Sequence, residues 1–151
     1  MKVVFVRHGQ TSENVAKRHQ PVDTPLTVVG RQQAMQAAKV IVQIKPTHIV
    51  TSPLVRTVQT ASLIANECDM IPSIDHSLVE LIRPDSITGY GHESWKSMFF
   101  YLWWYVGLSH QGESYKEIRQ RIAVARANLE RLPSDATVVV VSHSVFISLF
   151  I

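Results

Sequence analysis

Cysteine and long hydrophobic runs are the two features that this sequence most clearly lacks. Its 151 residues include a single cysteine, Cys68, which excludes an internal disulfide framework and suits a reducing compartment. The longest apolar stretch, residues 98–108, has about half the length that a bilayer requires. Only four apolar residues separate Lys2 from Arg7, which is too few for the core of a secretory signal. We therefore expect a cytoplasmic protein that has no membrane partner.

Charged residues are also sparse, at 18% of the chain, and the basic ones form no run. A net charge of +3 without a cluster of Lys and Arg argues against a nucleic-acid partner and for local binding of anions. Hydrophobic residues make up 46% of the chain, as in ordinary globular proteins. No internal repeat, low-complexity tract or linker is evident, so we expect one domain over residues 1–151.

The residues that are present alternate between two patterns of hydrophobicity. Short β-branched runs predict buried strands, and apolar residues three or four apart predict helices between them. Thr27 is expected to cap the first of these helices, and Pro53 to lie in the first turn of the second. The alternation predicts an α/β fold, a three-layer sandwich with a mostly parallel central sheet flanked by helices. The expected strands are residues 2–6, 47–52, 70–76 and 136–143, and the expected helices are residues 26–44, 53–67, 94–107, 113–132 and 145–151.

The last seven residues, VFISLFI, include six apolar ones. A terminal helix that is hydrophobic on all sides should be buried. Either a second subunit covers it, which would make the protein a homo-oligomer through this apolar end, or the natural chain continues past Ile151. We favour the second explanation, a truncated C-terminal end.

Polar residues follow three of the predicted strands at the point where each strand ends. They are RHG at residues 7–9, TSPLVRT at residues 51–57 and SHS at residues 142–144. Each cluster taken singly is weak, but ligands of open α/β sheets bind at this edge, and together the clusters bring two arginines and two histidines to it. Unpaired cations would be costly there, and phosphate matches the planar donor forks of Arg7 and Arg56. The sequence therefore predicts a phosphate site.

Five segments in family order, spread over essentially the whole chain, resemble the histidine phosphatase superfamily, the phosphoglycerate mutase-like clan. The resemblance implies a phosphoglycerate mutase-like fold and a single histidine phosphatase-like domain. It also implies phosphoryl transfer through a phosphohistidine. The segments are RHG at residues 7–9, SPLVRTVQTA at residues 52–61, SLVEL at residues 77–81, GES at residues 112–114 and VVVVSHS at residues 138–144.

The resemblance implies a role for each catalytic residue. His8 matches the nucleophile, which takes the phosphoryl group and forms the phosphohistidine intermediate. Glu80 matches the acid that protonates the leaving oxygen and then activates water. Arg7, Arg56 and His143 match the pocket that neutralises charge on the phosphate oxygens, a task that metal ions perform elsewhere. Because a neutral ring nitrogen attacks without prior deprotonation, neither a metal nor another cofactor is expected.

Five further residues belong to the expected site less directly. Gly9 would let the backbone approach the phosphate, and Thr11 and Asn14 stand where family members bind it. Their segment, TSEN, is also ordinary helix-capping chemistry, so both explanations stay open. Ser144 would add a hydroxyl beside the phosphate. Glu113 is the second choice for the acid, although the dipole of a helix that starts there also explains its carboxylate.

The chain departs from the family pattern after Glu80, where a glycine–tryptophan segment of many relatives is replaced by LIRPDSITGYGHESW. Arg83 and His92 in this stretch are the candidate substrate-pocket residues, which would meet a second anionic group of the substrate. The open alternative is that both are solvated loop residues.

The aromatic run at residues 99–107 is the other distinctive segment. We expect a helix whose aromatic side chains fill the core beneath the loop. The alternative is that Trp103, Trp104 or Tyr105 line the pocket and select an apolar or aromatic group.

These observations predict a metal-independent phosphatase for a phosphate monoester on a small molecule, with a phosphorylated protein as a less favoured substrate. A chain of this length has little room for the insertions with which mutases hold their substrate, which favours hydrolysis over a phosphoglycerate mutase reaction. A third hypothesis is a regulatory module that binds phosphate without turnover. Metal binding by His8 and His143 is a fourth, which the neighbouring arginines disfavour by charge repulsion.

Overall fold

The computed structural model describes residues 1–91, 93–105, 107 and 112–151. The predicted pocket residue His92 therefore lies outside the described residues. None of the helices in these ranges combines the length and the apolar character that a membrane crossing demands.

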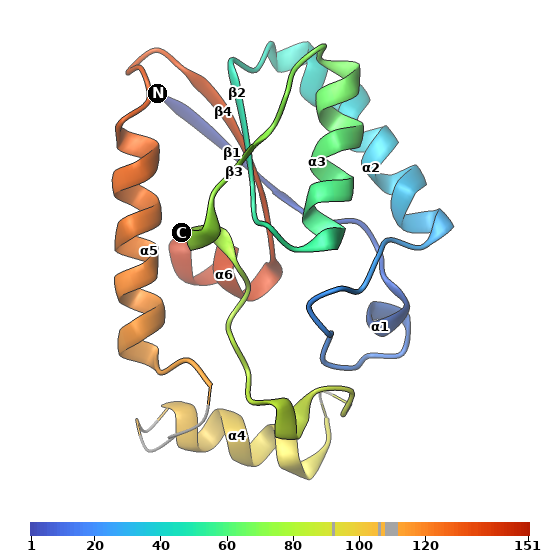
Figure 1. Ribbon diagram of the computed structural model, residues 1–151, viewed down its shortest axis with the longest axis vertical. Helices are drawn as coiled ribbons and strands as arrows, with labels where there is room; N and C mark the ends of the chain where they lie inside the picture. Colours follow the sequence, from blue (N-terminus) through green and yellow to red (C-terminus); the bar gives the residue numbers. More distant parts are fainter. Residues whose placement is uncertain (92, 106, 108–111) are drawn as a thin grey trace.

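Four parallel strands form the central sheet in the order β1-β4-β2-β3. β1 and β4 pair over their whole length, from Lys2 opposite Thr137 to Arg7 opposite Ser142. β4 is an inner strand, and its four consecutive valines have no exposed surface, as expected for a strand that is covered on both faces. The strands are β1 (Lys2–Arg7), β2 (His48–Thr51), β3 (Ser73–Ile74) and β4 (Thr137–Ser142) (Figure 1).

Helices cover both faces of this sheet, which confirms the predicted three-layer α/β sandwich (Figure 1). α2 and α3 pack on one face against Val139 and Val141, whereas α5 and α6 pack on the other against Val138 and Val140. α1 and α4 lie beyond the carboxyl ends of the strands. The helices are α1 (Ser12–Val15), α2 (Val28–Ile41), α3 (Val55–Glu67), α4 (Trp95–Tyr105), α5 (Tyr115–Glu130) and α6 (Ser144–Phe150), and the 3₁₀ turns are η1 (Val42–Ile44), η2 (His76–Leu78) and η3 (Asp85–Ile87).

The predicted helix starts are confirmed at α2 and wrong at α3. Thr27 caps α2, because its side chain accepts a hydrogen bond from the N–H of Gly30. α3 begins at Val55, so Pro53 lies outside its first turn. The chain is still bonded to the sheet at Ser52, whose N–H donates to a carbonyl of β4 at 3.1 Å. Pro53 therefore lies in the turn between β2 and α3.

The apolar terminal helix α6 is buried in part. Phe146 has no exposed surface, and Val145, Leu149 and Phe150 are partly buried against the same core cluster. Ile151 is exposed. That a second copy of the chain covers this end stays a prediction.

The turn after β1 lies directly on the start of α2. The carbonyl of Gln10 accepts a hydrogen bond from the N–H of Thr27 at 2.9 Å. A Cβ atom on Gly9 would come within 2.3 Å of the carbonyl oxygen of Gly30, and one on Gly30 within 2.1 Å of the carbonyl oxygen of Gln10. Both neighbours are backbone atoms that cannot turn aside as a side chain can. The two glycines therefore allow the segment that carries His8 to approach α2.

Replacement of Gly30 by alanine should destabilise the protein. A helical glycine changed to alanine ordinarily gains about 1 kcal/mol. Here the added Cβ overlaps the backbone of Gln10, so we expect a loss of about 1–3 kcal/mol in the free energy of unfolding, measured by urea denaturation. The neighbouring exposed change Val29→Ala should cost less than about 0.5 kcal/mol. A Gly30→Ala protein as stable as the parent would contradict the close packing described above.

Candidate active site

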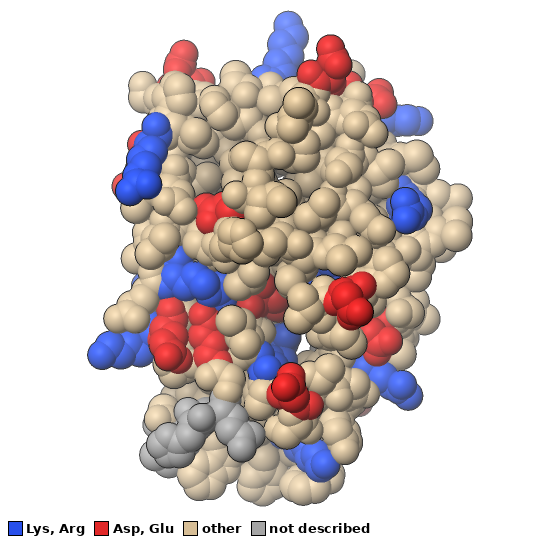
Figure 2. All heavy atoms as spheres, in the orientation of Figure 1, with Lys and Arg blue, Asp and Glu red and all other residues tan. Residues whose placement is uncertain are grey.

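A cavity of about 640 Å³ is lined by residues that follow β1, β2 and β4, at the edge where the sequence predicted a site. Figure 2 shows the molecule hollowed in this region, above α4, with basic and acidic atoms near the opening. Arginines outnumber carboxylates in the lining, and this excess of positive charge favours anionic ligands. The charged residues that line the cavity are Arg7, Arg18, Arg56, Arg83, Glu80 and Asp85.

His8 follows β1 and is held in one orientation by its own backbone. Its Nδ1 lies 2.8 Å from the carbonyl oxygen of Gly9, and since a carbonyl only accepts, Nδ1 carries the proton in the neutral ring. Burial, together with the charges of Arg56 and Arg7, lowers the pKa of His8 to about 4, although the bond to Gly9 opposes the shift. At neutral pH the other ring nitrogen, Nε2, therefore has a free lone pair and can act as a nucleophile.

His143 follows β4 and lies beside His8, with ring centroids 5.3 Å apart. Its Nε2 lies 2.9 Å from the hydroxyl oxygen of Ser52, and its buried Nδ1 has no hydrogen-bond partner among the described residues. Burial, with a smaller effect of Arg56, lowers the pKa of His143 to about 2, so this ring is neutral too. In the tautomer in which the hydroxyl of Ser52 donates to Nε2, Nδ1 carries the proton and has a donor left for an anion. In the described ranges no third His, Cys, Asp or Glu completes a metal-binding group.

Arg56 lies in the first turn of α3 and is 3% exposed. Its Nη1 donates to the carbonyls of Pro21 and Val22, at 3.1 and 3.4 Å, while its Nε has no partner among the described residues. Burial lowers its pKa to about 10, so it remains a cation at neutral pH. Arg56 lines the cavity, and a buried cation there suits a phosphate oxygen. Arg7, at the end of β1, lines the same cavity and is exposed.

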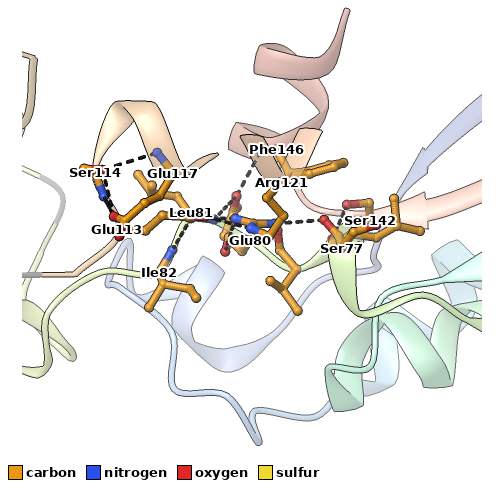
Figure 3. Close-up of polar contacts among 12 residues, drawn as sticks. Ser77, Glu80, Leu81, Ile82, Glu113, Ser114, Glu117, Arg121, Ser142 and Phe146 are labelled. Atoms are coloured by element: carbon orange, nitrogen blue, oxygen red, sulfur yellow. Dashed lines mark hydrogen bonds and ion pairs between the residues drawn. The ribbon is translucent and has the colours of Figure 1, made fainter. Parts of the chain in front are cut away.

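Glu80 lies in the loop after η2 and reaches the start of α6 (Figure 3). Its Oε1 accepts hydrogen bonds from the N–H groups of Leu81 and Phe146, both at 3.0 Å. Its Oε2 accepts one from the N–H of Val145 at 3.4 Å. Glu80 also lines the cavity, so it lies at the space that a substrate would occupy.

The weaker phosphate-binding candidates divide into two groups. Asn14 and Ser144 line the cavity. Thr11 is fully buried and caps α1, where its side chain accepts from the N–H of Asn14, and its hydroxyl donates to Gln20. The N–H of Gly9 already donates to the hydroxyl of a threonine in α3. The structure therefore contains the helix cap that the TSEN segment predicted. Phosphate binding by these residues stays a prediction.

Arg83 lines the cavity, and its Nε donates to the hydroxyl of Tyr101 at 2.9 Å. Tyr101 lines the cavity as well, and nothing in the sequence pattern distinguished it from its aromatic neighbours. Trp103 and Tyr105 are instead exposed, so they neither fill the core nor line the cavity. Trp104 packs against the core, as expected, and its Nε1 donates to a backbone carbonyl at 2.7 Å.

Glu113 is buried and faces Arg121, a residue that the sequence analysis missed. Oε1 of Glu113 accepts from Nε of Arg121 at 2.7 Å, and its Oε2 accepts from Nη2 at 2.5 Å. This ion pair gives the carboxylate a partner, and of the two candidate acids Glu80 is the one that lines the cavity. Arg121 lies three residues after Ile118 and four before Ala125, on the apolar stripe of α5, and that position was the available signal.

The chain is similar in sequence and in fold to known proteins. A sequence model of the histidine phosphatase superfamily (branch 1) matches residues 3–151. The chain is 33% identical over 153 residues to a Salmonella arizonae protein named probable phosphoglycerate mutase GpmB, covering 96% of this chain and 70% of that one. A solved structure described as a putative alpha-ribazole-5'-P phosphatase from Escherichia coli is 25% identical, with a TM-score of 0.85 over 99% of this chain and 77% of the other. A mycobacterial glucosyl-3-phosphoglycerate phosphatase complexed with VO3 is 29% identical, with a TM-score of 0.81 over 98% of this chain and 78% of the other.

Burial of the two neutral histidines should make stability depend on pH. In the unfolded chain His8 takes a proton near pH 6.5, whereas in the folded protein it does so near pH 4. Between these values the unfolded state binds more protons, so the free energy of unfolding falls as the pH is lowered, by about 1–3 kcal/mol for His8. Urea denaturation at several pH values measures this slope. His8→Asn should show a flatter slope than the parent, and equal slopes would contradict the burial of a neutral ring.

Proposed function

Because the chain belongs to the histidine phosphatase superfamily, we propose that it is a metal-independent phosphatase that hydrolyses a phosphate monoester through a phosphohistidine on His8. The observation that supports this most directly is the hydrogen bond of His8 Nδ1 to the carbonyl of Gly9, which leaves Nε2 unprotonated in a buried ring. His8 does not itself line the cavity, but the residue before it, Arg7, does. Neither a binding module nor a structural protein needs a buried nucleophile with one fixed tautomer.

The reaction proceeds in two displacements. Nε2 of His8 attacks phosphorus, the bond to the leaving oxygen breaks, and the proton of Glu80 passes to that oxygen. Water then attacks the phosphohistidine, Glu80 takes its proton, and inorganic phosphate leaves with His8 restored. Arg7 and Arg56 neutralise charge on the phosphate oxygens in both steps, and Nδ1–H of His143 donates to one of them.

Hydrolysis is favoured over phosphoglycerate mutase chemistry by two structural neighbours that are described as phosphatases. The mutase reaction is the second candidate, and the name of the Salmonella arizonae relative supports it. The two reactions are told apart by incubation with a phosphorylated sugar acid, since a phosphatase releases inorganic phosphate and a mutase interconverts the two isomers.

In this proposal, the substrate is a small molecule that carries a second anionic group besides the phosphate. Arg83 lies at the cavity with its Nε bonded to Tyr101, which leaves the two outer nitrogens of its guanidinium for a carboxylate. A phosphorylated protein is the less favoured substrate. We keep the cytoplasm as the proposed compartment because the chain has a single cysteine.

Loss of His8 should abolish turnover. We expect wild-type protein to hydrolyse p-nitrophenyl phosphate in the presence of a chelator, and His8→Ala to lower kcat by about 10³-fold or more because the nucleophile is gone. His76→Ala, at an exposed position outside the cavity, is the matched control and should keep the parental rate. Activity that survives the loss of His8, or that the chelator removes, would refute the mechanism.

Arg83→Gln should change substrate preference. We expect kcat/KM for a phosphorylated hydroxy acid to fall about 10- to 100-fold relative to kcat/KM for phenyl phosphate, because a charge-assisted hydrogen bond contributes about 1.5–3 kcal/mol. Arg31→Gln, at an exposed position on α2, is the control for a lost positive charge. An unchanged ratio of the two substrates would show that Arg83 does not meet a second anion.

A further inference from the structure

Arg121, on α5, contacts the loop that carries Glu80 and does not line the cavity itself. We propose that Arg121, held by Glu113, is the positioning residue that sets Glu80 for proton transfer to the leaving oxygen. This inference rests on the proposed function, because it assigns a task in the step that Glu80 performs there.

Every donor of the Arg121 guanidinium is used in this contact. Nη1 donates to the carbonyls of Ser77 and Val79, at 3.0 and 2.5 Å, and Nη2 donates to the carbonyl of Glu80 at 3.3 Å. Nε and Nη2 donate to the carboxylate of Glu113 at 2.7 and 2.5 Å. These five hydrogen bonds match the five N–H donors of an arginine, a set that a lysine with three donors cannot supply.

Glu113 holds the other end of the same loop. Its N–H donates to the carbonyl of Ile82 at 2.7 Å, and its Oε2 accepts from the N–H of Ile82 at 3.3 Å. The backbone on both sides of Glu80 is therefore tied to one ion pair, as Figure 3 shows. Ser142, at the end of β4, adds a third tie, since its hydroxyl donates to the carbonyl of Leu78 at 2.8 Å. The loop is thus fixed to the sheet and to α5 together.

Burial of two charges costs free energy, so stability alone does not explain this ion pair. The side chains of Arg121 and Glu113 are 15% and 7% exposed, and removal of one partner would leave the other as a buried, unpaired charge. Apolar residues of similar volume often replace such pairs without loss of stability. A proton donor, by contrast, must sit within hydrogen-bond reach of its oxygen, and a shift of about 1 Å can cost about 10² in rate. Fixing the backbone of Glu80 supplies that precision.

The test compares two aryl phosphates that differ in their need for an acid. p-Nitrophenolate is a weakly basic leaving group that departs without a proton, whereas phenolate needs one. kcat/KM reports the phosphorylation step for both substrates, so the ratio of the two values isolates proton donation. Glu80→Gln serves as the reference variant, and we expect it to lower kcat/KM for phenyl phosphate by about 10²-fold relative to p-nitrophenyl phosphate.

Arg121→Lys and Glu113→Gln should reproduce this selective loss, by about tenfold or more for phenyl phosphate and less for p-nitrophenyl phosphate. The affinity for vanadate, measured by inhibition, should stay within about threefold of the parent, because the phosphate pocket is untouched; a factor of three is under 1 kcal/mol. Arg119→Lys, two residues earlier on the exposed side of α5, is the matched control and should keep the parental ratio.

Equal loss on both substrates, no loss on either, or loss of vanadate binding in both variants would assign Arg121 a purely structural role and overturn the inference. Failure of the proposed function looks different. If wild type is inactive, or if Glu80→Gln leaves the ratio of the two substrates unchanged, the acid itself is wrongly assigned, and the task given to Arg121 falls with it.

Discussion

The parallel pairing of β1 with β4 is the constraint on which the candidate site depends. The two strands are in register to their ends, where Arg7 lies opposite Ser142. The residue that follows each strand is a histidine. The N–H of His8 continues the ladder by donating to the carbonyl of Ser142 at 3.1 Å. A shift of register by one residue would turn every side chain to the opposite face and separate the two rings. The valines that bury β4 therefore also determine the distance between His8 and His143.

At this edge of the sheet Arg56 stays charged at neutral pH, whereas His8 and His143 are neutral. Burial lowers the pKa of both rings well below neutrality, and the adjacent cations add to this effect. Arg56 is buried as well, but its ordinary pKa is so high that it stays protonated. The outcome is a neutral imidazole at His8, the proposed nucleophile, beside fixed positive charges. This arrangement suits attack on a phosphate dianion because the ring itself carries no charge.

Glu80, the proposed acid, is held in a different way from His8, the proposed nucleophile. His8 sits at the end of a strand, whose position the sheet already determines, whereas Glu80 sits in a loop after a 3₁₀ turn. A loop carries no ladder of its own, so its position has to come from contacts made by other elements. Here α6 contacts the carboxylate of Glu80, and α5 contacts its backbone through Arg121. The last two helices of the described fold thus support the part of the site that the sheet does not.

The sequence by itself determined the fold class and the edge of the sheet at which His8, Arg7 and Arg56 lie. A short continuous run of β-branched valines favours a buried strand, and polar residues that end parallel strands meet at one edge. What only the tertiary structure decided depends on burial and on contacts between distant residues. The tautomer of His8, the neutral state of both rings and the packing of Gly9 on Gly30 belong here. So does the bond from Arg121 to the carbonyl of Glu80, which joins residues 41 positions apart, a separation over which no local pattern in a sequence carries information.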